Sequence, residues 1–527
     1  MTNIFSSLRG CTMLVLGLGD SGLGMARWCA RWGAQVRVWD SRETAPQDAA
    51  LAEHLPAAQR LRGPLTPEML AGVSRVLKSP GLSPLDERIA AVLKQAHEAG
   101  LPVQGELELF IAALAALQAD RAYAPQLIAI TGTNGKTTTT GMTALLVART
   151  GRSVAMAGNI GPTLLQTLAD ALDAQLLDAD AALPQVWVLE LSSFQLDGVR
   201  GFAPHAAAVL NITEDHLDWH GSMPAYVAAK ANIFGAHTTM VLNRDDAAVA
   251  ALAPVAVPAA AAPRGRARAA AVPPARPVVW FGLEAPRRSG DFGLVLENDM
   301  AWLVRAQAAD DTPRRAATLT AEPAEIHLQR LMPADALRVR GRHNAANALA
   351  ALALASAIGC PLAPMLHGLR EYAGEPHRVE YLGTLDGVDA FDDSKGTNVG
   401  ATVAALNGLG ADKAPAKLVV ILGGDGKGQN FAPLREPLQR HVRAIATLGR
   451  DAAAIEAALE GLAQPLQRHD TLEAATRWCF AQARSGDAVL LSPACASLDM
   501  FRNYGHRAEV FVREVQNIAA ERGGVLA

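Results

Sequence analysis

Short apolar runs recur along the chain, and each one stops at a glycine-rich or polar cluster. Apolar runs of this length, separated by helical stretches, are typical of buried strands in a parallel sheet. They occupy residues 12–16, 35–39, 128–130, 186–189, 206–211, 388–391, 418–422, 444–448 and 488–491. Because the carboxyl ends of parallel strands share one edge of a sheet, the polar clusters are predicted to line ligand sites. The pattern therefore predicts an α/β protein of three consecutive segments.

The clearest polar cluster follows the strand predicted at 128–130 and leads into a predicted helix. Its residues are Gly132, Thr133, Asn134, Gly135, Lys136, Thr137 and Thr138. The backbone N–H groups of such a turn and the helix N-terminus converge on one point, which suits the phosphates of ATP. Lys136 would reach the β- and γ-phosphates, and the Thr137 hydroxyl would bind Mg²⁺. The alternative is an ordinary strand-to-helix turn, since only two residues separate these glycines instead of the usual four.

The first segment carries another glycine-rich turn, Gly17-x-Gly19-x-x-Gly22, directly after its first strand. The next predicted strand ends in Asp40, as in Rossmann dinucleotide sites. This pattern predicts a nucleotide site, with a pyrophosphate at the helix N-terminus and Asp40 near a ribose or base. The loop 78–81 is expected beside the same cleft. Two alternatives stay open: glycines that serve only packing, and an NAD-dependent dehydrogenase, which leaves Lys136 unexplained.

Three polar residues are expected near the metal of the phosphate loop. Glu190 ends a predicted strand, and His216 follows a run of acids after the next strand. Since Mg²⁺ prefers oxygen ligands, Thr137 and Glu190 are the first candidates to bind it. His216 could bind a second metal, orient a substrate carboxylate or be a structural histidine. Lys230 lies on a helix predicted at 225–234, where it either reaches solvent or lies near the metals.

Further along the chain, Asn344 and Asn347 stand one turn apart at the start of an alanine-rich helix. Their amides could bind an adenine edge or cap the helix. The run 375–378 could bring a cation, Arg378, onto the γ-phosphate when domains close. An interdomain salt bridge is the competing interpretation of that run.

Composition narrows the class of protein. The chain has 527 residues, half of them hydrophobic, and a formal net charge of −4. This length predicts about two to four domains, and the small charge gives no reason to expect nucleic acid or an anionic membrane as a partner. Five scattered cysteines and an N-terminus without a signal-peptide layout favour a cytoplasmic protein. The stretch 345–366 is interrupted by prolines, so no membrane span is expected, and a monomer is the default expectation.

Domain boundaries are expected at 1–103, 104–374 and 375–527. Residues 251–276 are rich in Ala, Pro and Arg, which cannot specify a packed core. A solvated insertion is therefore expected there, with a basic interaction site as the alternative. The stretch 169–184 is interpreted as a second, shorter insertion.

Taken together, the motifs resemble the Mur ligase family, whose members add amino acids to the peptidoglycan precursor. The wider family shares the loop 132–138, Glu190, His216, the run 343–347 and the pair His377-Arg378. The D-glutamate-adding branch of the family is indicated by residues 190–196, 211–218, 393–398, 423–427 and 492–499. The Rossmann-like first segment distinguishes the chain from folylpolyglutamate synthases, which belong to the same superfamily. The resemblance covers nearly the whole chain apart from the two insertions.

The resemblance implies three domains: a Rossmann-like N-terminal domain, a central P-loop ATPase-type domain and a Rossmann-like C-terminal domain. It also implies an ATP- and Mg²⁺-dependent reaction that joins D-glutamate to UDP-MurNAc-L-Ala through an acyl phosphate. In such a reaction, Lys136 and Thr137 hold phosphates and Mg²⁺, and Glu190 binds the metal. His216 and a carbamylated Lys230 then form the second metal site.

The same resemblance assigns the remaining candidate residues to three ligands. ATP is expected to contact Asn344, Asn347, Arg378 and Asp393. The UDP end of the substrate is expected along Asp20, Ser21, Asp40, Ser41, Ser79, Gly81 and Asn159. D-Glutamate is expected at Thr397, Lys427, Ser497, Leu498 and Tyr504. Two residues depart from the family pattern, since Tyr504 stands where Phe is expected and Ser21 stands where Thr occurs.

Overall fold

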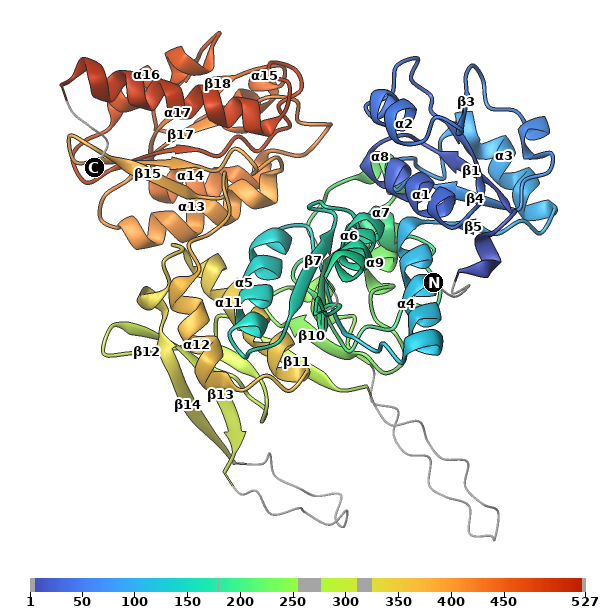
Figure 1. Ribbon diagram of the computed structural model, residues 1–527. Coiled ribbons are helices and arrows are strands. Elements are labelled where there is room, and N and C mark those ends of the chain that lie inside the picture. The colour runs from blue at the N-terminus through green and yellow to red at the C-terminus, as the bar shows by residue number, and fades with distance from the viewer. Residues whose placement is uncertain (1–4, 179, 255–275, 310–324, 524–527) are drawn as a thin grey trace, which may run out of the picture.

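The computed structural model describes residues 5–178, 180–254, 276–309 and 325–523. Three α/β segments follow one another along the chain, each built on its own sheet (Figure 1). The first and third segments lie on either side of the central one, and a small antiparallel sheet extends from the central segment (Figure 1). The fold class predicted from the apolar runs is confirmed. Most of the insertion predicted at 251–276, from residue 255 to 275, lies outside the described residues.

The first segment is a parallel sheet of strand order β3-β2-β1-β4-β5. Its elements are η1 (Ser6–Leu8), β1 (Thr12–Leu16), α1 (Asp20–Arg31), β2 (Gln35–Trp39), α2 (Asp48–His54), β3 (Gln59–Leu61), η2 (Pro67–Leu70), β4 (Arg75–Lys78), α3 (Glu87–Glu98) and β5 (Val103–Gln104). The chain order reverses at β1, which pairs with both β2 and β4. In open α/β sheets, the crevice beyond the strand ends at such a switch point is the usual ligand site.

The central segment is a six-stranded parallel sheet of order β11-β10-β9-β6-β8-β7. Its elements are α4 (Glu106–Arg121), β6 (Gln126–Thr131), α5 (Lys136–Ala148), β7 (Val154–Gly158), α6 (Leu164–Leu177), β8 (Val186–Glu190), α7 (Ser193–Leu196), β9 (Ala206–Val209), α8 (Leu217–His220), α9 (Met223–Ala231), β10 (Thr239–Asn243), α10 (Ala247–Ala250), β11 (Val278–Phe281), α11 (Arg342–Ala357) and α12 (Leu362–Glu371). Alternate residues of β6 face opposite cores, with Ala129 packed beside α4 and α6, and Ile128 and Ile130 packed beside α5 and α11.

The alanine-rich helix α11 is buried along most of its length, where it packs against the central sheet, α5 and α13. None of the helices in the described residues is both long and apolar enough to span a bilayer. The stretch interpreted as a second insertion, 169–184, is in large part the second half of α6, and Leu172 within it is buried in the core. The helix predicted at 225–234 is α9, which ends three residues earlier, at Ala231.

The small antiparallel sheet has no counterpart in the predictions made from the sequence. It consists of β12 (Phe292–Glu297), β13 (Met300–Ala308) and β14 (Ile326–Pro333), followed by η3 (Ala334–Ala336). Asn298 and Asp299 join β12 to β13 with positive φ values of 51° and 61°, as a type I′ hairpin turn requires. Few side chains along β12 and β14 are fully buried, so the hydrophobic alternation that would reveal these strands is weak.

The third segment is a mixed sheet of order β15-β16-β20-β17-β18-β19, in which only the β15–β16 pair is antiparallel. Its elements are β15 (Glu380–Leu385), β16 (Val388–Asp392), α13 (Val399–Lys413), β17 (Leu418–Gly423), η4 (Ala432–Leu434), α14 (Arg435–His441), β18 (Val442–Leu448), α15 (Ala452–Ala458), β19 (Leu466–Arg468), α16 (Leu472–Gln482), β20 (Ala488–Leu491) and α17 (Tyr504–Glu521). The polar clusters after β16, β20 and β17 lie at one edge because these three strands are adjacent and parallel. An isolated bridge between Asp425 and Ala496 ties two of these loops together.

Candidate active site

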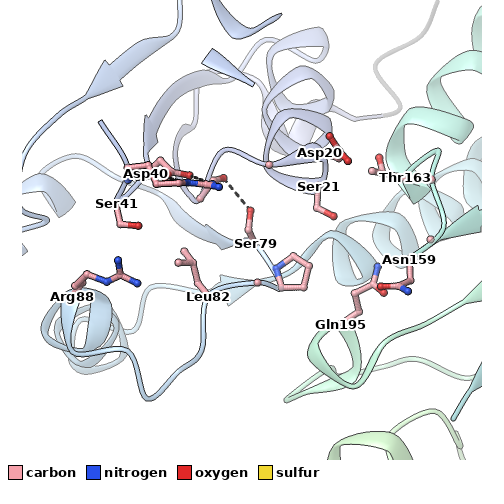
Figure 2. Close-up of a pocket in the computed structure, with 17 residues that line it drawn as sticks. Asp20, Ser21, Asp40, Ser41, Ser79, Leu82, Arg88, Asn159, Thr163 and Gln195 are labelled. Carbon is pink, nitrogen blue, oxygen red and sulfur yellow. Dashed lines mark hydrogen bonds and ion pairs between the residues drawn. The ribbon is translucent and has the colours of Figure 1, made fainter. Parts of the chain in front are cut away.

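A cavity of about 450 Å³ lies between the carboxyl edge of the first sheet and the central segment (Figure 2). We call it the first cavity. All seven residues predicted for the UDP end of the substrate line it: Asp20, Ser21, Asp40, Ser41, Ser79, Gly81 and Asn159. Figure 2 shows Ser41 and Arg88 at one end and Asn159, Thr163 and Gln195, from the central segment, at the other.

Asp40 is held firmly at the end of β2. Its carboxylate accepts hydrogen bonds from the Leu18 N–H at 2.7 Å and from Arg42 Nε and Nη2, each at 2.8 Å. Burial alone would raise the pKa of Asp40, but the hydrogen bonds from Arg42 and Leu18 outweigh burial and hold the pKa well below its ordinary value. Asp40 is therefore ionised, and it positions the Arg42 guanidinium at the cavity wall.

In the glycine-rich turn beside the first cavity, the first turn of α1 packs directly against the backbone at the end of β1. A Cβ on Gly22 would lie 2.0 Å from the Gly17 carbonyl oxygen, so only glycine fits there. Ser79 Oγ donates a hydrogen bond of 3.0 Å to that same carbonyl, which fixes the β4 loop to the turn (Figure 2). The start of α1 thereby faces the cavity, as expected for an anion-binding helix N-terminus.

The sequence analysis missed several residues that line the first cavity. They are Arg42, Leu82, Arg88, Thr163 and Gln195. Arg42 could have been noticed beside Asp40, and Gln195 lies within the run 190–196 without having been given a role. Thr163 and Arg88 belong to no motif, because the fold alone brings them to this site.

The phosphate loop lies where β6 ends, and two lysines meet on one of its carbonyl oxygens. Lys136 Nζ donates to Gly132 O at 3.0 Å and to Thr133 O at 2.9 Å. Lys230 Nζ donates to the same Gly132 oxygen at 2.9 Å and is almost fully buried. Burial lowers the pKa of both lysines, and Lys136 lowers that of Lys230 further by charge repulsion. The sequence left two positions open for the Lys230 side chain, in solvent or near the phosphate loop. The structure places it at the loop.

Glu190 lies at the end of β8, and its two carboxylate oxygens differ in their partners. Its Oε1 accepts a hydrogen bond of 2.9 Å from Asn159 Nδ2, while the buried Oε2 has no hydrogen-bond partner among the described residues. Thr137 Oγ1 accepts a hydrogen bond of 2.8 Å from Arg378 Nη2, which reaches it from the start of the third segment. A buried, unpartnered carboxylate oxygen is costly unless a ligand or cation satisfies it, so Glu190 fits a cation site.

His216 lies beside this centre in a left-handed conformation, with a φ of 56°. Its Nε2 is 3.5 Å from Asp215 Oδ2, and its ring packs edge-on against Phe194. Burial lowers the pKa of His216, Asp215 opposes this, and Lys427 of the third segment contributes to the lowering. His216 is therefore a neutral imidazole near neutral pH, and it lies within electrostatic reach of Lys427.

A second cavity, of about 60 Å³, lies between the phosphate loop, the start of α11 and the third segment. The residues predicted for ATP that line it are Asn134, Gly135, Thr138, Asn344, Asn347, Arg378 and Asp393. Gly132, Thr133, Lys136 and Thr137, also predicted for ATP, are not among its lining residues but lie on the same loop. Burial raises the pKa of Asp393 to about 7, although hydrogen bonding from Ser492 and the charge of Arg378 lower it.

The residues predicted for D-glutamate lie on the loops after β16, β17 and β20 and at the start of α17. Lys427 is exposed, Ser497 is buried, Leu498 is 73% exposed and Tyr504 is 38% exposed. None of these, nor Thr397, lines the first or the second cavity. The structure thus brings the five residues to one sheet edge, outside both of these cavities. Lys395, which the sequence analysis missed, lies with its Nζ 5.5 Å from the centre of the Tyr504 ring.

One further group of side chains has the composition of a metal site. His377, Glu380 and Asp392 each bring one ligand atom within 4.8 Å of the others. His377 Nδ1 already makes a hydrogen bond of 2.7 Å with Asp392 Oδ2, however. This contact satisfies the imidazole without a metal and fixes the orientation of its ring.

Comparison with known proteins identifies the family. Three family models match the chain: a Mur ligase MurD-like N-terminal domain over residues 11–105, a Mur ligase middle domain over 130–260 and a Mur ligase glutamate ligase domain over 377–495. The chain is also 57% identical over 521 residues to the UDP-N-acetylmuramoylalanine–D-glutamate ligase of Burkholderia pseudomallei, with 98% of each chain covered. This chain belongs to the Mur ligase family.

A second curated Mur ligase of the same name, from Albidiferax ferrireducens, is 56% identical over 520 residues, again with 98% of both chains covered. Solved Mur ligases share the fold at much lower identity. The UDP-N-acetylmuramate-alanine ligase of Thermotoga maritima has a TM-score of 0.53 and 18% identity over 96% of this chain and 99% of that one. The MurF ligase of the same organism, solved with ADP, has a TM-score of 0.54 and 16% identity over 98% and 100% of the two chains.

Membership of the Mur ligase family confirms the resemblance seen in the motifs. Mur ligases are ATP-dependent ligases of peptidoglycan synthesis, so ATP is a substrate of this chain. The dehydrogenase alternative is thereby set aside, since the glycine turn at 17–22 belongs to a MurD-like N-terminal domain.

Proposed function

We propose that this Mur ligase joins D-glutamate to UDP-MurNAc-L-Ala in the cytoplasm, with ATP converted to ADP and phosphate. The observation that carries the proposal is the 57% identity, over 98% of both chains, to a curated ligase named for this reaction. The two cavities support it, because one suits a nucleotide-linked substrate and the other lies at the phosphate loop. All reactants are small molecules, so we expect neither nucleic acid nor a membrane as a partner, and we propose that the chain acts as a monomer.

The domains predicted from the sequence divide this work. We propose that residues 1–103 bind the UDP end of the substrate, that 104–374 bind ATP and that 375–527 bind D-glutamate. Asp20, Ser21, Asp40, Ser41, Ser79, Gly81 and Asn159 would then contact the UDP-linked substrate. In support, the MurD-like N-terminal model matches residues 11–105, nearly all of them in the first range, and the glutamate ligase model matches 377–495, within the third.

In the first step, the alanyl carboxylate attacks the γ-phosphorus, the bond to the ADP oxygen breaks and an acyl phosphate forms. The protein has little covalent work to do in such a step, since positioning and charge neutralisation dominate. Lys136 leaves its carbonyl partners, Gly132 and Thr133, and turns to the phosphates. Arg378 leaves the Thr137 hydroxyl and adds a second cation, while Asn344, Asn347 and Asp393 hold the nucleoside.

Mg²⁺ is expected at Thr137 and Glu190, and the unpartnered Oε2 of Glu190 fits this role. When bound, Mg²⁺ neutralises charge on the phosphates. His216 and Lys230 would hold a second ion. Because burial favours the neutral amine of Lys230, this amine can add to CO₂ and lose a proton, giving a carbamate whose oxygens bind metal as a carboxylate does.

In the second step, the neutral amine of D-glutamate attacks the acyl carbon, and phosphate leaves from the tetrahedral intermediate as the amine proton passes to solvent or phosphate. Lys427 pairs with a glutamate carboxylate. Thr397, Ser497, Leu498 and Tyr504 complete this site. Since these residues line neither of the two cavities, we propose that the bound acyl phosphate completes the wall of their site.

The proposal is tested by incubating the full chain with ATP, Mg²⁺, UDP-MurNAc-L-Ala and D-glutamate and measuring the mass of the nucleotide product. We expect a product heavier by one glutamate residue. A product heavier by another amino acid, when a mixture is supplied, would keep the ligase and overturn the choice of D-glutamate.

A further inference from the structure

Three asparagines form a continuous set of paired hydrogen bonds through the phosphate loop. Asn211, just after β9, accepts from the Asn134 N–H at 2.7 Å and donates from Nδ2 to Asn134 O at 3.0 Å. The side chain of Asn134 in turn exchanges two hydrogen bonds with the side chain of Asn398. Asn134 Nδ2 donates to Asn398 Oδ1 at 3.2 Å, and Asn398 Nδ2 donates to Asn134 Oδ1 at 3.1 Å.

The orientation of each amide is fixed by its other partners. Asn398 caps α13, and its Oδ1 accepts from the Ala401 N–H at 2.8 Å. Its Nδ2 must therefore point toward acceptors, which are Asn134 Oδ1 and, at 3.4 Å, Asp215 Oδ2. Asn398 is only 7% exposed, so water does not readily replace these partners. Gly400, two residues later, packs closely on the same group, since a Cβ there would lie 2.7 Å from Thr213 Oγ1 and 3.1 Å from Asn134 Nδ2 and would force a side chain to shift.

We infer that Asn211 and Asn398 are positioning residues that hold the phosphate loop through Asn134. Asn211 fixes the loop backbone to the central sheet, and Asn398 fixes the loop side chain to the third segment. The loop has both supports only while the third segment is docked as described. Asn398 does not line the second cavity, so it acts on the nucleotide through Asn134 and not by contact.

This arrangement links the proposed sites of ATP and D-glutamate. Thr397, proposed to contact D-glutamate, directly precedes Asn398, and the same short loop reaches the phosphate loop. D-Glutamate at Thr397 and ATP at Lys136 therefore favour the same docked position of the third segment. The inference rests on the proposed function for the identity of D-glutamate, but the pairing of Asn134 with Asn398 does not depend on that identity.

The test is a double-mutant cycle of Asn398→Ser and Asn134→Ala in the full chain. Serine retains the helix cap, since Ser and Asn cap equally well, but it lacks the amide that pairs with Asn134. For Asn398→Ser we expect kcat to fall about 10- to 100-fold, the range found when supporting groups around a site are removed. The KM for UDP-MurNAc-L-Ala should stay within about twofold, because the first cavity is untouched. The double variant should be no slower than the slower single variant, because each change removes the same pair.

A binding measurement separates this inference from the proposed function. ADP titrated calorimetrically into the Asn398→Ser variant should bind about tenfold more weakly than to the unmodified chain, whatever the amino acid substrate is. The matched control is Asn430→Ser, which also removes an asparagine that caps backbone in the third segment, at Ala432 N–H, but which should leave ADP affinity unchanged.

Three results would overturn the inference: unchanged ADP affinity in Asn398→Ser, additive losses of kcat in the double variant, or an equal loss of affinity in Asn430→Ser. Melting temperatures are measured for every variant. Should Asn398→Ser melt early, Asn398→Asp replaces it, because aspartate also caps α13 but lacks the amide N–H groups given to Asn134 and Asp215. If the unmodified chain binds ADP but does not ligate D-glutamate, the proposed function fails. The double-mutant cycle can then still be measured, with the ADP affinities of the four proteins in place of kcat.

Discussion

The first cavity and the phosphate-loop centre differ in how far their polar groups are satisfied. In the first cavity, Asp40 is fully paired with Arg42 and Leu18, and the Gly17–Ser79 contact locks two loops together. At the phosphate loop, Lys136 and Lys230 share one carbonyl oxygen, and within the part of the chain that the structure describes one oxygen of Glu190 has no partner. The first cavity is open, at about 450 Å³, whereas the second cavity, beside the phosphate loop, measures only about 60 Å³.

This difference indicates two modes of binding. The first cavity already has the shape and charge of a binding site, so its ligand pays little for reorganisation. At the phosphate-loop centre, lysine and arginine side chains are bonded to protein oxygens, and in the proposed function they would exchange these oxygens for phosphates. The chain enters the third segment beside the phosphate-loop centre with a strained backbone, since φ is positive at His377 and Val379. Strain of this kind is typical of functional sites.

The largest expected effect comes from removing the loop cation. Lys136→Ala should lower ligation by at least about 10³-fold, because the γ-phosphate loses a cation that would offset its charge in the transition state. UDP affinity, measured by calorimetry, should not change, because Lys136 does not line the first cavity. Lys94→Ala, on the exposed face of α3, is the matched control. Loss of UDP binding in Lys136→Ala would show that the two regions are not independent.

The next effect should come from the second buried lysine. If Lys230 serves the metal site as proposed, Lys230→Ala should lower kcat by at least about 10- to 100-fold, the range found when groups that support metal ligands are removed. If the amine acts as a carbamate, activity of the unmodified chain should fall in buffer stripped of CO₂ and return when bicarbonate is added, as measured by initial rates. Lys230→Ala should not respond to bicarbonate. If the activity of the unmodified chain does not depend on bicarbonate, Lys230 does not act as a carbamate.

Lys427→Ala tests the edge of the third sheet. The KM for D-glutamate should rise about 10- to 100-fold, in line with the loss of a charge-assisted hydrogen bond worth about 1.5–3 kcal/mol, while kcat changes little. Lys417→Ala, another lysine of the third segment, whose Nζ donates to Arg440 O, serves as the control. An unchanged KM for D-glutamate would place Lys427 outside that site.

The smallest effect is expected in the preformed cavity. Asp40→Asn should raise the KM for UDP-MurNAc-L-Ala about tenfold, because Arg42 loses its charged partner, and should leave kcat unchanged. The folded-state pKa of Asp40 lies below its unfolded value. Its contribution to stability is therefore present above about pH 4 and is lost as the pH falls toward the folded pKa. Urea unfolding between pH 2 and pH 5 should thus show a shallower acid decline for Asp40→Asn, and an identical decline would contradict the pairing.

The sequence predicted the strands well, and it predicted the first cavity through its motifs. β1, β2 and β20 begin and end as the apolar runs indicate, because buried parallel strands are nearly continuous hydrophobic runs. The seven residues expected at the first cavity all line it. The antiparallel sheet of β12, β13 and β14 was not predicted, because β12 and β14 are partly exposed and show only weak alternation of hydrophobic and polar residues.

Residues brought together from distant parts of the chain could not be predicted in the same way. The pair Asn134–Asn398 spans 264 positions, and neither asparagine has a local pattern that names its partner. Thr163 reaches the first cavity only because α6 packs beside α1. For Lys230, the sequence left solvent and metal site equally possible, and burial at 2% exposure decides the position of the side chain.

The most direct test of the account is phosphate release from ATP in the presence of UDP-MurNAc-L-Ala, with D-glutamate, L-glutamate or no amino acid. Sustained release is expected only when both UDP-MurNAc-L-Ala and D-glutamate are present. Equal release with L-glutamate, or sustained release without any amino acid, would contradict it.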